Sequence, residues 1–194
     1  MDRLNTWYVN RGDNVSQRTL RIAQFTNVVL FALVMGVFWG TWFSLSRSIA
    51  SIRPETFLEV GHTMIGNLGT PMSILMPAAL ISSAIVAVAL FRRGRAAFSL
   101  AIAGFLLMTG ALVITLAVNV PIDYEINQWT VSTLPDDWTA TRDRWEFYHG
   151  LRTFISIAGL ACVVASALRA VPSLDFARDV ASGSRATQSR QLVS

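Results

Sequence analysis

The stretch AAFSLAIAGFLLMTGALVITLAV, residues 96–118, decides the fold, because it carries no charged side chain and is long enough to cross a bilayer. Three further apolar runs have comparable length, at residues 22–46, 72–91 and 151–169. Only 14% of the chain is charged, whereas about 25% is usual in a soluble domain. The sequence therefore predicts an all-α integral membrane four-helix bundle, with its transmembrane domain at residues 22–170.

The arginines predict the orientation. All 16 basic residues are arginine, a usage typical of GC-rich coding and hence of a bacterial source. Eleven lie before the first run, between the second and third, or at and beyond the end of the fourth. By the positive-inside rule, both termini are cytoplasmic, with a tail at residues 1–21 and a disordered tail at 171–194. Topology thus explains the basic charge of this bacterial cytoplasmic membrane protein, and no nucleic-acid partner is needed.

The two long connections are expected on the extracytoplasmic side, each with a short interfacial helix. In residues 47–71, apolar side chains recur at roughly helical spacing. In the second connection, Pro121 is expected to end the third span, and Asp137 to begin a helix that continues into the fourth.

A polar stripe enters the membrane with the fourth span. Arg142, Glu146, His149 and Thr153 are spaced so that they share one helix face. Turning charged groups to lipid would cost several kcal/mol each. The stripe is therefore expected to face the interior of the bundle, near its outer mouth.

Each of the two histidines follows a glutamate by three residues, giving the pairs Glu59–His62 and Glu146–His149. Helix-bundle di-metal proteins use two such pairs with additional carboxylates, for which Glu125 or Asp123 would serve here. Iron, copper or manganese is then expected at this site. Two alternatives stay open, namely a haem with both histidines as axial ligands and a purely structural polar network.

The segment from Asn119 to Thr153, with NVPIDYEINQW, DDW and RDRWEFYHGLRT, resembles the anthrone oxygenase-like family of small four-helix membrane proteins. The resemblance implies a membrane oxygenase that uses dioxygen to oxidise the methylene of an aromatic anthrone to a quinone. It covers about residues 25–170. The positions that match the family are Asn119, Pro121, Trp138, Arg142, Trp145, His149, Arg152 and Thr153.

Together these features predict an oxygenase or related oxidoreductase that takes a hydrophobic substrate at the outer mouth of the bundle. His149 and Glu146 would bind the metal or remove a C–H proton, and Arg152 would stabilise the resulting anion. The residues expected to bind and orient the substrate are Asn119, Asn127, Arg142 and Trp145. The alternative is a non-enzymatic membrane subunit of a larger complex, and a homo-oligomer is compatible with either.

Overall fold

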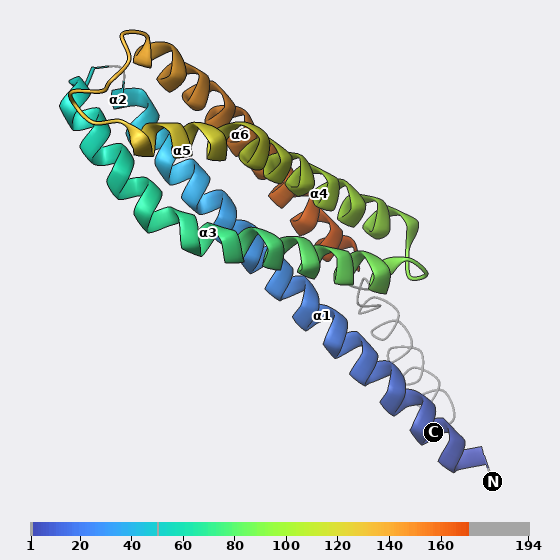
Figure 1. The fold of residues 1–194 in the computed structure, drawn as a ribbon. Coiled ribbons are helices and arrows are strands. Elements are labelled where there is room, and N and C mark those ends of the chain that lie inside the picture. Colours follow the sequence, from blue (N-terminus) through green and yellow to red (C-terminus); the bar gives the residue numbers. More distant parts are fainter. Residues whose placement is uncertain (1, 50, 171–194) are drawn as a thin grey trace, which may run out of the picture.

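The computed structural model describes residues 2–49 and 51–170, with side chains from residue 17 onward except that of residue 47. Every regular element in this part of the chain is helical, which confirms the all-α prediction (Figure 1). The elements are α1 (Asp2–Thr41), η1 (Trp42–Ser46), α2 (Arg47–Ile49), α3 (Pro54–Leu90), α4 (Arg95–Ile114), η2 (Thr115–Asn119), α5 (Val120–Gln128) and α6 (Trp138–Ala170).

The described part of the chain contains four helices that are long and apolar enough to cross a bilayer. The chain is therefore a multi-pass membrane protein, as the four apolar runs predicted. The helical segments are longer than those runs: they cover Gln17–Ser46, Pro54–Leu90, Arg95–Gln128 and Trp138–Ala170. Residues 2–21, expected as a tail, belong to α1, and the predicted tail at 171–194 lies outside the described residues.

The connection expected at residues 47–71 is much shorter in the structure. Instead of an interfacial helix followed by a separate span, α3 runs unbroken from Pro54 to Leu90, through Pro71 and Pro77. Proline fits the first turn of a helix, and the backbone groups that an internal proline frees are tolerated where neighbouring helices satisfy them. The apolar face of the first turns of α3, including Phe57 and Leu58, is buried against other helices.

The prediction that Pro121 ends the third span is also wrong. The helix continues through η2 into α5 and ends at Gln128. In η2 the hydrogen bonds reach back five residues, as shown by the Val120 N–H, which donates to the Thr115 carbonyl. The ladder of hydrogen bonds is therefore already rerouted where Pro121 lacks its N–H, so the chain stays helical.

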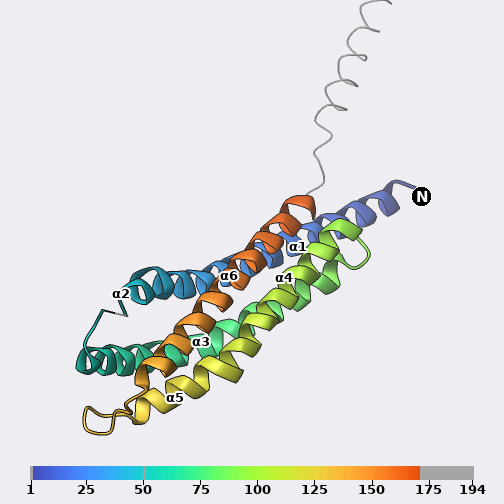
Figure 2. The same cartoon turned by 90° about the horizontal axis from the view of Figure 1, so that it is seen from above.

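Three clusters of buried apolar side chains fill the bundle. One contains Leu20, Leu90 and Ala101 near the α3–α4 turn, and a central one contains Phe31, Met108 and Val163. The third, the end cluster, lies where α2, α3, α5 and the start of α6 meet; Figures 1 and 2 show these segments gathered at one end of the bundle. Its buried members are Ile49, Phe57, Leu58, Ile122, Ile126 and Trp129.

Candidate functional site

A cavity of about 530 Å³ lies between the central cluster and the end cluster. Its walls come from α1, η1, α2, α3, α4, η2, α5 and α6, and most of its lining side chains are apolar. Phe38 and Met76 of the central cluster line it on one side, while Ile49 and Phe57 of the end cluster line it on the other. Its volume is within the range of small-molecule sites, roughly 300–1,000 Å³.

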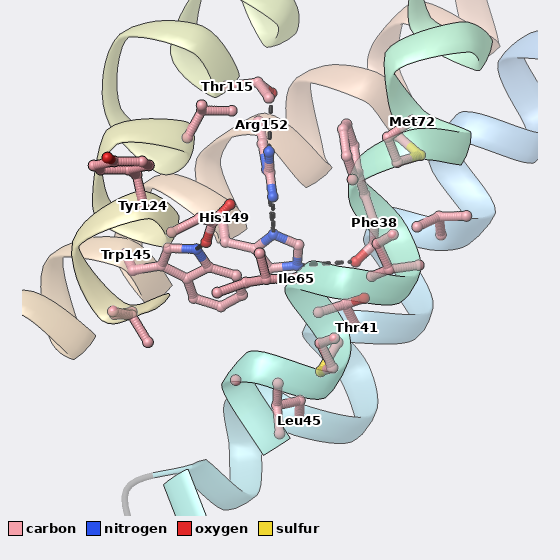
Figure 3. A pocket seen from close by; sticks show the side chains of 18 of the residues that line it. Phe38, Thr41, Leu45, Ile65, Met72, Thr115, Tyr124, Trp145, His149 and Arg152 are labelled. Carbon is pink, nitrogen blue, oxygen red and sulfur yellow. Dashed lines mark hydrogen bonds between the residues drawn. The ribbon is translucent and has the colours of Figure 1, made fainter. Parts of the chain in front are cut away.

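One wall of this cavity carries a chain of hydrogen bonds through two buried ionisable groups (Figure 3). Arg152 donates through Nη1 to Thr115 Oγ1, 2.9 Å away. On its other side, Nε and Nη2 donate to His149 Nδ1 at 3.2 and 2.9 Å. His149 Nε2 is 3.2 Å from the backbone carbonyl of Phe38. These bonds join α1, α4–η2 and α6.

This chain of bonds defines the state of His149. A guanidinium only donates, so Nδ1 must supply a lone pair to Arg152. Nε2 must then carry the hydrogen, because the Phe38 carbonyl only accepts. His149 is therefore held as the neutral Nε2–H tautomer, with both ring nitrogens engaged.

Arg152 is 7% exposed, yet no carboxylate among the described residues lies within salt-bridge distance of it. Its three bonds use the Nε hydrogen and one hydrogen on each terminal nitrogen. A guanidinium has five N–H donors, so two remain for a ligand. By contrast, Arg142 bonds through Nε and Nη2 to Asp143 Oδ1, at 2.8 and 2.7 Å. Arg152 is thus the cation in the wall that a ligand anion would pair with.

Trp145 connects this chain of bonds to a carboxylate. Its indole ring stacks on the His149 imidazole, with centroids 4.8 Å apart and planes 6° apart. Its Nε1–H donates to Asp123 Oδ1 over 2.7 Å. Asp123 lines the cavity, and its Oδ2 makes no hydrogen bond to any described residue. The wall therefore presents a cation with spare donors and a carboxylate with a spare acceptor.

The two π-helical segments lie beside this wall. Thr115 is the first residue of η2, and Phe38 and Thr41, which line the cavity, lie in the last turn of α1 before η1. π-Helical turns widen a helix locally and are frequent at functional sites. On α6, Gly150 allows a close approach of η1: a Cβ there would lie 3.2 Å from Trp42 Nε1.

Several of the predicted site residues do meet at the cavity. Arg142, Trp145, His149 and Arg152 line it from α6, and Asn127 lines it from α5. The stripe on α6 faces inward as predicted at Arg142, His149 and Thr153, all of which are buried.

Other predicted residues lie elsewhere. Glu146 is half-buried and does not line the cavity, so the expected Glu146–His149 pairing is replaced by the Arg152–His149 bond. Asn119 is fully buried but also lies outside the lining; its Nδ2 donates to the Trp145 carbonyl at 3.2 Å. Asn119 thus ties η2 to α6 from outside the cavity lining.

The residues expected to bind a metal are not gathered into one site. His62 Nε2 lies 3.1 Å from the Ile126 carbonyl, and Glu59 and Glu125 are exposed. Among the side chains that the structure describes, from residue 17 to residue 170, no group of three or more His, Cys, Asp or Glu could hold a metal ion.

Three contributions to the site were missed by the sequence analysis. Thr115 looks like one more small residue of an apolar span, and the Phe38 carbonyl is a backbone group without a sequence signal. Asp123 was considered only as an additional metal ligand. An acidic residue just beyond a span, on a helix that continues past a proline, is the signal that could have identified it.

Residues 67–162 match the sequence model of the family described as anthrone oxygenase. The chain belongs to the anthrone oxygenase-like family. The matched range contains Thr115, Asp123, Trp145, His149 and Arg152, so the polar wall lies within the family domain. Comparison with curated proteins gave no match, and neither did comparison with solved structures. The family domain indicates an oxygenase-type function.

Proposed function

We propose that this anthrone oxygenase-like protein oxidises the ring methylene of a hydrophobic, anthrone-like aromatic with dioxygen inside the cavity. The family supplies the reaction class. The observation that carries the proposal is Arg152, a buried cation in the wall of an apolar cavity, with two unused donors and no carboxylate within salt-bridge distance among the described residues. Intramembrane charges that are costly to bury are usually retained for function.

The chemistry of an anthrone suits this wall. Loss of a methylene proton gives an anion whose charge is delocalised onto the ring carbonyl oxygen. Donors aimed at an oxygen that becomes negative stabilise the transition state, and they are most effective where water is excluded. Thr115 and His149 hold the guanidinium of Arg152 on two sides. His149 is then a positioning residue, which differs from its expected role as base.

Asp123 is the proton acceptor in this proposal. The lone pair of His149 is occupied by Arg152, whereas Asp123 keeps Oδ2 free while Trp145 holds Oδ1. A carboxylate in the cavity wall, oriented by an indole N–H, is suited to remove an acidic C–H proton.

The resulting anion then reduces dioxygen. Over the whole reaction the methylene carbon loses two hydrogens and forms a double bond to one oxygen atom, and the second oxygen atom leaves as water. Anthrone and dioxygen thus give anthraquinone and water. Both reactants are apolar and dissolve in the bilayer. With both termini in the cytoplasm, as the arginines predict, the cavity lies toward the extracytoplasmic side.

Asp123→Asn tests the proposal, because the amide oxygen can still accept the Trp145 N–H but cannot take up the proton. We expect anthrone oxidation to fall by about 10²–10⁴-fold, the usual contribution of a general base. Anthraquinone formation and oxygen uptake, measured on protein in lipid nanodiscs, would show this. Glu146→Gln, on the same helix as His149 but outside the cavity lining, should keep most of the activity. Loss of anthrone oxidation in Glu146→Gln, with Asp123→Asn still active, would contradict Asp123 as the proton acceptor. A wild-type protein that does not oxidise anthrone would overturn the proposed function.

A further inference from the structure

We propose that the ligand of this cavity enters sideways from the bilayer, through a portal between the middle of α3 and the η2–α5 segment. The identity of the ligand as a planar aromatic rests on the proposed function. The position of the portal rests on the cavity and its surroundings alone.

The portal is marked by residues that line the cavity and are also exposed at the surface. Such residues occur on two facing segments, α3 and η2–α5. Among them, Leu116 is 59% exposed and Tyr124 is 71% exposed. Those on α3 are Gly69, Ser73 and Pro77, and those on η2 and α5 are Leu116, Val120 and Tyr124. A side chain that reaches both the cavity and the outside lies at the mouth of the cavity. Asn127, also exposed and lining, lies one α5 turn beyond Tyr124.

The rim of this mouth is suited to lipid and not to water. None of its six residues is charged, and Leu116, Val120 and Pro77 are wholly apolar. Both rim segments belong to helices that are apolar enough to span the bilayer. Tyr124 has an apolar ring with a polar tip, which is the kind of side chain enriched where hydrocarbon meets headgroups.

The route along the bundle axis is closed. The end cluster lies between the cavity and the segments that connect α2 to α3 and α5 to α6. Its side chains are tightly packed: Ile49, Phe57 and Ile126 are only 3–5% exposed. A ligand arriving from water would have to displace these packed side chains. The lateral route requires no such displacement.

The helix packing explains why an opening exists here. α3 packs against α4 and against α5, whereas it makes no comparable contact with η2 between them. On the α3 side, Gly69 leaves space: a Cβ added there would meet nothing within 4 Å. Small residues and a widened helical turn therefore face each other across the opening.

A matched pair of glycines tests the portal. Gly66 and Gly69 are both exposed on α3, and an added Cβ has open space at both, but only Gly69 lines the cavity. The measurement is the binding of anthraquinone, delivered in nanodisc lipid, followed by quenching of tryptophan fluorescence in stopped flow. In Gly69→Phe we expect association and dissociation to slow by about tenfold each, with Kd changed by less than about twofold, because a narrowed path affects both rates alike. Gly66→Phe should bind at wild-type rates.

The contrary outcomes are distinct. Weaker binding in Gly69→Phe, caused by faster dissociation, would mean that the introduced phenyl ring occupies the cavity itself. Equal slowing of both rates in Gly66→Phe would place ligand entry elsewhere. Either result overturns the portal, as does a wild type that binds no anthraquinone. If anthraquinone binds and Gly69→Phe slows it, but anthrone is not oxidised, the portal stands and the proposed function fails.

Discussion

The same four long helices pass through two regions that are packed in opposite ways. Where α4 crosses α6, Gly104 and Gly159 bring the backbones into contact: a Cβ on Gly104 would lie 2.6 Å from Val163 Cγ2 and 3.3 Å from the Gly159 carbonyl. Further along the same pair of segments, Thr115 and Arg152 meet through their side chains beside the cavity.

This contrast shows how a small bundle can contain a site. Close packing of small residues is a major source of helix association in lipid, where burial of apolar surface gives little driving force. The packed region can therefore hold the helices together, while the cavity region holds a buried cation that contributes little to stability. A substitution in the packed region should therefore act mainly on stability, and a substitution beside the cavity mainly on turnover.

Among the substitutions that compare these two regions, the largest effect is expected from Arg152→Met, which removes the cation but keeps an unbranched side chain. Loss of the donors to the developing oxyanion should lower anthrone turnover by about 10²–10³-fold. The thermal unfolding midpoint should stay the same or rise, because a buried charge without a carboxylate within salt-bridge distance is costly to desolvate. Turnover and unfolding are measured on the same detergent-purified sample. A lower midpoint would instead make Arg152 a structural residue of the bundle.

Gly104→Ala should give the reverse pattern, in which stability falls and turnover does not. The added Cβ meets Val163 and the backbone of Gly159, so the helices must separate, at a cost of about 1–3 kcal/mol of unfolding free energy. Gly110→Ala, on the same helix but with no atom within 4 Å of the new Cβ, should gain about 0.5–1 kcal/mol, because alanine loses less backbone entropy than glycine. Reversible unfolding in mixed detergent gives both values. A gain in stability for Gly104→Ala as well would contradict the backbone contact between α4 and α6.

The contrast also shows which parts of the structure the sequence could predict. The length of the apolar runs predicts four helices able to span a bilayer, and the structure confirms them. The spacing of the stripe predicts which side chains face inward, and this is confirmed for Arg142, His149 and Thr153 but not for Glu146. The bond from His149 to Phe38 joins residues 111 apart through a backbone carbonyl, and no residue pattern encodes such a contact. Pro121 misled for a related reason: a proline normally interrupts a helix, but the π-turn of η2 lets this helix continue past it. The two Glu-x-x-His pairs are local patterns, and the fold does not gather them into one metal site among the described side chains.

The smallest effect is expected from Thr115→Val, for which Thr109 on the same helix provides a matched control. Thr115 and Thr109 each donate to the carbonyl four residues back, over 2.8 Å, and only Thr115 also accepts a bond from Arg152. Losing one bond that orients the guanidinium should lower turnover by about tenfold, equivalent to about 1.4 kcal/mol. Thr115→Ser should restore it, and Thr109→Val should leave turnover unchanged. Equal losses in Thr109→Val and Thr115→Val would mean that turnover reports the integrity of α4, and the guanidinium would then need no support from Thr115.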